Sequence, residues 1–145
     1  MKRTFTSKLS NMHGVQVKLV AGESLGTGTW APDNLHLSFH EARAGAGAKS
    51  YIVRSDGDGL RQLLPTVDSV WFSVWSADQK NIYVTGTDKG SPILTVWRTN
   101  LDGSHPEKFV DNCGMVSDID PGGHYLLAVM PYGEKTGDLR SLHVQ

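Results

Sequence analysis

The sequence has little of what marks a disulfide-stabilised, membrane-spanning or nucleic-acid-binding protein. Its one cysteine, Cys113, excludes a disulfide within the chain, and we interpret it as a small buried hydrophobic residue. No run approaches the roughly 20 apolar residues of a membrane helix, and the N-terminal segment lacks the apolar stretch of a signal peptide. Lys and Arg number 14 against 15 Asp and Glu, with no basic block, which argues against contact with nucleic acid or an anionic membrane.

Signals for helices are equally scarce. Charged residues make up only 20% of the chain, while glycine occurs 16 times. No segment combines a helical spacing of apolar residues with capping residues at its ends. We therefore expect an all-β protein built from short strands and tight turns.

What the sequence does contain is a repeat about 45 residues long. Trp30, Trp75 and Ile119 occupy the same place in three copies, 45 and 44 residues apart. This period predicts three structurally similar units along the chain. Each copy reads as an apolar strand, a tight turn and a second strand: GTWAPDNLHLSFHE at 28–41, SVWSADQKNIYVTG at 73–86 and VSDIDPGGHYLLAV at 116–129.

A second marker has the same period. The turns Asp56-Gly57 and Asp102-Gly103 each precede a further apolar strand, and Asp-Gly is a strong hairpin signal. The segment 9–20 is a degenerate copy of this half of the repeat. Each unit then holds four short strands, and four strands in roughly 40–50 residues is typical of one blade of a β-propeller.

We predict a single partial β-propeller domain over residues 1–145, with about three blades of four antiparallel strands. Because closed propellers have about four to eight blades, two interpretations stay open. Either the chain is part of a longer propeller, or two copies form a homodimer that completes a six-bladed ring. The expected parts are the third and fourth strands of a preceding blade at 1–20, blades at 27–65 and 69–110, and an incomplete blade at 114–145.

The repeat resembles that of TolB-like propellers, whose blades read W-S-P-D-G-x-x-I-A-F and then D-G-x-x-x-R-x-L. The matching segments are GTWAPDNLHLSF, SVWSADQKNIYV and RSDGDGLRQL, and the resemblance covers nearly the whole chain. Asn34 and Gln79 stand where that family has glycine, and Ile119 stands where it has tryptophan. We expect these departures to weaken the turns and the core without changing the fold.

Two patterns suggest chemistry, and neither has the context that chemistry requires. GESLG at 22–26 fits the G-x-S-x-G elbow of serine hydrolases, but the residues after Ser24 are poor helix formers, and we place Ser24 on a linker between blades. His36 and His40 lie on one face of a strand but about 13 Å apart, too far to share a metal ion. We predict no catalytic residue, no metal and no cofactor.

Four aromatic residues, Trp71, Phe72, Trp75 and Trp97, could line a ligand cage. Their placement along two strands favours a core between blades instead.

The candidate binding surface is the set of loops at one end of the propeller channel. The polar or aromatic candidates on these loops are Arg43, Lys49, Lys89, Tyr132, Glu134 and Lys135.

The resemblance to TolB-like propellers implies a non-catalytic module for protein–protein interaction or scaffolding. It also implies the sensor or interaction part of a larger bacterial protein, in the periplasm or outside the cell. Two alternatives stay open. One is the accessory propeller of a prolyl-oligopeptidase-like serine peptidase whose catalytic domain lies elsewhere in the parent protein. The other is a structural repeat protein that assembles with itself.

Overall fold

The computed structural model describes residues 5–10, 16–22, 24–43, 47–130 and 139–144. Over these ranges the chain forms strands and turns with no helix, which confirms the all-β expectation. The same part of the chain therefore contains no helix that is long and apolar enough to cross a membrane. The strands form four antiparallel sheets, and each sheet consists of strands that follow one another in the sequence.

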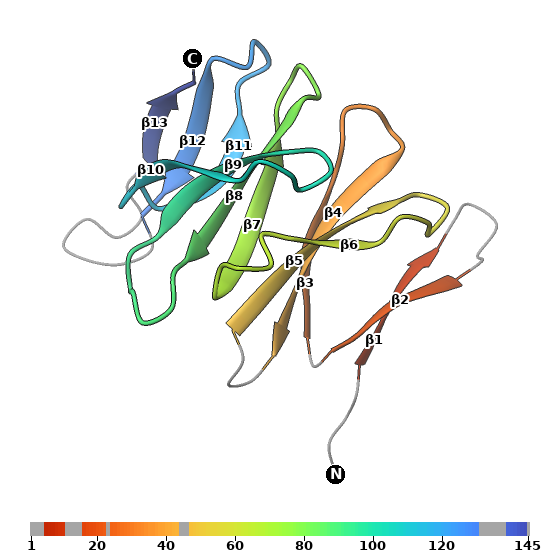
Figure 1. The fold of residues 1–145 in the computed structure, drawn as a ribbon. Coiled ribbons are helices and arrows are strands. Elements are labelled where there is room, and N and C mark those ends of the chain that lie inside the picture. Colours follow the sequence, from red (N-terminus) through yellow and green to blue (C-terminus); the bar gives the residue numbers. More distant parts are fainter. Residues whose placement is uncertain (1–4, 11–15, 23, 44–46, 131–138, 145) are drawn as a thin grey trace.

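Three of the sheets are propeller blades, and they stand side by side in a row in Figure 1. A two-stranded sheet lies at one end of this row, and β13 lies at the other. That the two-stranded sheet belongs to a preceding blade stays a prediction, as do the limits of the domain. The two-stranded sheet pairs β1 (Phe5–Ser10) with β2 (Gln16–Gly22).

The first and second blades have four strands each, and the third has three. The first blade contains β3 (Ser24–Trp30), β4 (His36–Arg43), β5 (Gly47–Arg54) and β6 (Arg61–Leu63). The second contains β7 (Ser69–Trp75), β8 (Asn81–Thr87), β9 (Thr95–Asn100) and β10 (Glu107–Asp111). The third contains β11 (Met115–Ile119), β12 (Tyr125–Val129) and β13 (Leu139–His143).

One tight turn joins the first two strands of every blade. It contains Asn34, Gln79 or Gly123 at the same place, with φ angles of 58°, 60° and 73°. The amide of each residue donates a hydrogen bond to the carbonyl three residues earlier, at 3.1, 3.0 and 2.8 Å. This left-handed conformation is the one that glycine adopts most readily. The departures from the family pattern at residues 34 and 79 therefore strain the turn but leave its shape unchanged.

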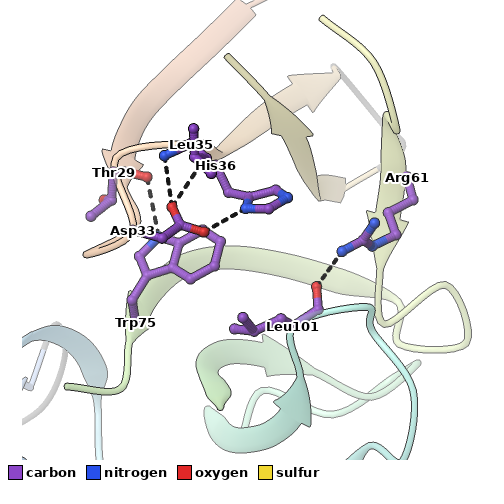
Figure 2. A network of polar contacts seen from close by, with 7 residues as sticks. All are labelled: Thr29, Asp33, Leu35, His36, Arg61, Trp75 and Leu101. Atoms are coloured by element: carbon purple, nitrogen blue, oxygen red, sulfur yellow. Dashed lines mark hydrogen bonds and ion pairs between the residues drawn. The ribbon is translucent and has the colours of Figure 1, made fainter. Parts of the chain in front are cut away.

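An aspartate carboxylate holds this turn in the first two blades. The Asp33 carboxylate accepts hydrogen bonds from the amides of Leu35 and His36, at 2.8 and 3.0 Å, and contacts the His36 ring at 2.7 Å, as Figure 2 shows. In the second blade, Asp78 accepts hydrogen bonds from the Lys80 amide at 3.1 Å and from a serine hydroxyl at 2.7 Å.

In the third blade, the amides of the turn donate to a carboxylate that lies two residues earlier in the turn. Asp120 accepts hydrogen bonds from the amides of Gly122, His124 and Tyr125, at 3.0, 2.6 and 2.5 Å. Its position corresponds to that of Ser76, whose hydroxyl accepts a bond from the equivalent amide in the second blade. The three turns thus differ in sequence but satisfy the same backbone donors.

Each blade packs its innermost strand against the preceding blade. Strand β7 contacts β4 and β5, and β11 contacts β7 and β8. The first junction buries an apolar cluster of Ala31, Ile52, Leu63, Leu64, Val67, Val70, Trp75, Ile82 and Val84. The second buries a smaller cluster of Val74, Tyr83, Val96, Cys113, Val116 and Leu126. Cys113 is 2% exposed, which confirms its interpretation as a buried hydrophobic residue.

Trp75 is the centre of the first junction, and only 3% of it is exposed. Its indole Nε1 donates to the Thr29 carbonyl oxygen at 3.2 Å, as Figure 2 shows. The same Nε1 lies equally near the Ser38 hydroxyl, also at 3.2 Å. The Ser73 hydroxyl reaches the same Ser38 hydroxyl at 2.8 Å. One residue of the second blade therefore combines apolar burial with hydrogen bonds to two strands of the first.

Further polar contacts align the two blades along their length. The Ser50 hydroxyl donates to the carbonyls of Val70 and Trp71, at 3.2 and 3.0 Å. Toward the outer edge, the Arg61 guanidinium donates to the Leu101 carbonyl at 2.5 Å. Because these partners are 20 to 40 residues apart in the sequence, they fix the angle between blades rather than the shape of either one.

Replacing Trp75 tests the importance of this junction. We expect Trp75→Ala to lower the free energy of unfolding by about 3–5 kcal/mol, because it removes a large buried side chain. Leu60→Ala, at a position that is 38% exposed, is the control and should change it by less than about 1 kcal/mol. Urea denaturation followed by circular dichroism measures the free energy of unfolding of both variants. Equal losses would contradict the importance of the Trp75 junction.

The turn carboxylates predict how stability depends on pH. Burial raises the pKa of Asp33, but the His36 hydrogen bond and the turn amides lower it more, so it lies below the ordinary value of 3.8. The Ser76 hydroxyl lowers the pKa of Asp78, and the Tyr125 amide lowers that of Asp120. The stabilisation by these three carboxylates is thus complete above pH 3.8. It is lost as the pH falls through their lower pKa values in the folded protein.

We therefore expect the free energy of unfolding to fall with pH below about 4 in the natural protein. The triple variant with Asp33→Asn, Asp78→Asn and Asp120→Asn should show a weaker dependence over that range. Urea titrations at a series of acidic pH values measure the two slopes. Identical slopes would show that these turns do not contribute to acid sensitivity.

Candidate partner-binding pocket at one end of the blades

An apolar pocket of about 520 Å³ lies where the first and second blades meet the start of the third. It is at the end of the blades where β4 and β8 finish and where β7 and β11 begin. Its wall includes Ala42 near the end of β4, Met115 at the start of β11, and Thr87, Ser91 and Pro92 at and after the end of β8. The lining residues are His40, Ala42, Trp71, Phe72, Thr87, Ser91, Pro92, Leu94 and Met115.

The aromatic wall of the pocket is formed across the junction between two blades. The imidazole of His40 on β4 lies 5.4 Å from the Phe72 ring on β7, measured between ring centroids. Phe72 and Met115 also border a second, smaller pocket of about 190 Å³ between β7 and β11. The two pockets therefore adjoin along the innermost strands of the second and third blades.

A β-bulge in β7 explains why two consecutive aromatic side chains line one pocket. In a regular strand, Trp71 and Phe72 would point to opposite faces of the sheet. The pairing of β7 with β8 instead shifts register between Val70 and Ser73, and such a bulge redirects side chains. Both aromatic residues are half-buried and both reach the pocket.

Gly114 positions Met115 at the floor between the two pockets. The φ angle of Gly114 is 92°, and a Cβ atom there would lie 2.4 Å from the Val129 carbonyl oxygen. One residue beyond Met115, the Val116 amide donates a buried hydrogen bond of 2.9 Å to the Thr85 hydroxyl of the second blade. Only glycine lets the chain approach β12 this closely before it enters β11.

The predicted candidate residues have different surroundings. Lys49 is half-buried, and its ammonium donates to the Asp68 and Val67 carbonyls at 3.0 and 3.4 Å, so it ties β5 to the linker before β7. Lys89 is exposed in the turn after β8. Arg43 is the last residue of β4, where it pairs with Gly47.

The remaining candidates, Tyr132, Glu134 and Lys135, lie outside the described residues. Lys49 and Lys89 are not among the residues that line the apolar pocket. The role of all six in partner binding stays a prediction.

The four aromatic residues of the sequence analysis divide into two pairs. Trp75 is buried in the first core cluster and Trp97 packs against it, which confirms the core interpretation for these two. Trp71 and Phe72 line the pocket instead, although Phe72 also packs against the second cluster. The sequence did not reveal this difference because a bulge leaves no strong mark in a single sequence.

The chemistry of the pocket is that of contact with apolar groups. Its polar side chains are His40, Thr87 and Ser91, and the Ser91 hydroxyl already accepts a hydrogen bond of 3.1 Å from the Ile93 amide. Over the described ranges, no three His, Cys, Asp or Glu residues are grouped so that they could hold a metal ion. The pocket can therefore receive an apolar side chain or ring, with His40 as a polar neighbour.

No family model matches the sequence, and no curated protein matches it. Solved structures do match the fold. TolB from Acinetobacter baumannii aligns with a TM-score of 0.63 at 14% identity, over 91% of this chain and 36% of that one. An oligogalacturonate lyase in complex with manganese aligns with a TM-score of 0.65 at 14% identity, over 90% and 36%. A chain of the nidogen–laminin complex aligns with a TM-score of 0.62 at 15% identity, over 91% and 49%.

These likenesses confirm the β-propeller fold that the repeat predicted, and TolB is among the solved propellers that share it. The chain spans between about a third and a half of the length of the solved propellers that it matches. Proteins with this fold include an enzyme as well as TolB, so the fold does not by itself decide whether this chain is catalytic.

Adding a methyl group at Gly114 tests how the pocket floor is built. Gly114→Ala and Gly90→Ala both place alanine at a positive φ, but space is open around Gly90. We expect Gly114→Ala to lower the free energy of unfolding by about 1–3 kcal/mol more than Gly90→Ala, because only Gly114 also meets backbone atoms. Thermal and urea unfolding measure the difference, and equal effects would contradict a close approach at Gly114.

Proposed function

We propose that the chain is a non-catalytic TolB-like propeller module that binds a protein partner at the channel-end pocket. The observation that carries this proposal is the apolar depression formed by Trp71, Phe72 and Met115 at the ends of the innermost strands. Apolar and aromatic pockets of this kind anchor the few side chains that contribute most of the binding energy in protein complexes.

The arrangement of the two pockets favours an extended segment of the partner. They adjoin along β7 and β11 and share Phe72 and Met115, so neighbouring side chains of one peptide could each fill one of them. Polar groups at the rim, such as His40 and Ser91, would then meet the peptide backbone. The occupant of the two pockets would be an apolar peptide or loop, carried by a bacterial protein of the periplasm or cell exterior.

The position of Ser24 supports a non-catalytic function. A nucleophile elbow needs a strand, a sharp turn that carries the serine, and a helix. Ser24 is instead the first residue of β3, which extends to Trp30 and pairs with β4, with a shift of register between Leu25 and Gly28. Ser24 therefore begins a strand of a blade and is not followed by the helix that a nucleophile elbow requires.

A second candidate function, self-assembly, is favoured by a different observation. Trp30 and Leu35 of the first blade are 54% and 55% exposed, far more than is usual for large apolar side chains that pack between blades. These residues lie away from the pocket, so a homodimer and a further protein partner are compatible.

Selection of binding peptides tests the principal proposal. A displayed library of random peptides is selected on the natural chain and then measured against Pro92→Arg, which places a charged side chain in the pocket. We expect apolar peptides whose affinity falls at least about tenfold in this variant. Pro106→Arg is the matched control, because Pro106 is also exposed but lies in the turn before β10.

The peptide affinities for the three proteins decide between support and rejection of the proposal. Peptides that lose affinity in Pro92→Arg and keep it in Pro106→Arg would support binding at the pocket. Failure to select any peptide, or equal affinity for all three proteins, would overturn the proposal.

A further inference from the structure

A polar pocket of about 240 Å³ lies between the second and third blades. It is at the end of the blades where β7 finishes and β8 begins, whereas the channel-end pocket lies where β7 begins and β8 finishes. The two pockets have no lining residue in common. The second blade contributes Asp78, Asn81, Tyr83 and Arg98 to the polar pocket, and the third contributes its turn at Gly122 and Gly123.

The first junction shows what usually fills this place in the repeat. Tyr83 pairs with Arg98 in the second blade as Ser38 pairs with Ile52 in the first. Ser38 and Ile52 are both 0% exposed, because Trp75 of the next blade packs over them. The second blade thus presents a phenol and a guanidinium to the third blade at places where the first blade presents a serine and an isoleucine to the second.

The third blade covers these polar groups with small residues. Ile119 stands where the second blade has the larger Trp75. The turn after it contains Gly122 and Gly123, which have no side chain to fill the space. A Cβ atom at Gly123 would lie 3.2 Å from that of Ala77, so this turn lies directly against the second blade. A hollow with polar walls follows from this combination.

The ionised groups at the pocket already have partners of opposite charge. The Arg98 guanidinium donates to the Glu107 carboxylate. The Asp78 carboxylate accepts hydrogen bonds from the Ser76 hydroxyl and the Lys80 amide, and its other oxygen lies 4.0 Å from the Lys80 ammonium. A charged ligand would therefore lose its hydration without gaining an unpaired charge from either group. The pocket favours a neutral ligand.

The same groups keep the capacity for further hydrogen bonds. A carboxylate has about four acceptor positions and a guanidinium five donor hydrogens, more than the contacts above use at Asp78 and Arg98. The Asn81 carboxamide can both donate and accept. Burial raises the pKa of Tyr83 more than its hydrogen bond with Arg98 lowers it, so this side chain stays a neutral phenol near pH 7. Donors and acceptors therefore line one hollow.

We propose that this pocket binds a neutral polyhydroxylated ligand, a single sugar ring. A hydroxyl group both donates and accepts, so neighbouring hydroxyls of one ring can donate to Asp78 and accept from Arg98 or Asn81. The C–H groups of the ring can pack on Ala77. The volume is below the roughly 300 Å³ at which pockets for drug-sized ligands begin, which suits an occupant of this size. Because the channel-end pocket is separate, failure of this proposal would leave the proposed peptide binding untouched.

Ligand-observed NMR on the natural 145-residue chain is the first measurement. Saturation-transfer difference spectra are recorded with glucose, galactose, mannose and N-acetylglucosamine, and with glycine as a charged probe. Phosphate, a second charged probe, is titrated into ¹⁵N-labelled protein. We expect at least one sugar to bind with a dissociation constant on the order of 1 mM, because a single ring has few atoms to contribute. Titration of the labelled protein with that sugar should shift the amide signals of Gly122 and Gly123.

Two variants and a control place the sugar in the pocket. Asn81→Leu removes the carboxamide at similar size, and Ala77→Arg extends a long charged side chain from an exposed position beside the pocket. Each should weaken sugar binding at least about tenfold. Gln62→Leu is the matched control, because Gln62 is also a half-buried amide on a strand but belongs to the first blade. It should leave the dissociation constant unchanged.

Urea unfolding of each variant checks that the fold is kept, and Ala77→Arg carries the test if Asn81→Leu fails to fold. Loss of sugar binding in the folded pocket variants, with binding kept in Gln62→Leu, would support the proposal. No binding by any of the four sugars, equal binding in a folded pocket variant, or binding of glycine or phosphate in place of the sugars would each overturn it.

Discussion

The seating of one blade's tryptophan on the face of the blade before it is the contact on which the arrangement of this protein depends. Each blade is a small sheet with an apolar face, and such a sheet has little stability alone. Trp75 supplies apolar burial together with a hydrogen-bond donor, and Thr29 and Ser38 supply the acceptors at a fixed place on the neighbouring sheet. Because the donor must meet these acceptors, the contact sets both the distance and the angle between blades. The serine contacts along the same junction then align the rest of the strands.

The turns have a supporting function of a different kind. They bring the first two strands of each blade together, so that groups such as the Thr29 carbonyl and the Ser38 hydroxyl face the next blade. Three different sequences produce the same turn, because the backbone donors can be satisfied by Asp33, by Ser76 with Asp78, or by Asp120 alone. What the fold requires at this place is an acceptor for the amides and one residue with a positive φ angle, rather than a fixed motif.

The contrast between local turn chemistry and packing between blades explains which features of the structure the sequence predicts. The period of Trp30, Trp75 and Ile119 and the Asp-Gly turns indicated the blades, because strand alternation and turn chemistry are local properties. The pocket depended on the bulge that turns Trp71 and Phe72 to one side, and a bulge arises from how two strands pair. The burial of Trp75 was also invisible in the sequence, since Trp30 and Trp75 hold the same place in the repeat but are 54% and 3% exposed. Lys49, predicted as a binding residue, makes hydrogen bonds to a neighbouring linker, which only the packing of β5 reveals.

Because Ile119 stands where the first two blades have tryptophan, the two junctions between blades differ in stability. In proteins built from stacked units, stability is approximately the sum of the units and of the contacts between neighbours, so the weakest contact decides where the structure opens. The second junction has the smaller buried cluster and a polar pocket beside it, whereas the first buries the indole of Trp75. The third blade is consequently the part that separates first, while the first two remain together as a unit. Amide hydrogens in β11–β13 would then exchange with solvent through a local opening that leaves the Trp75 junction formed.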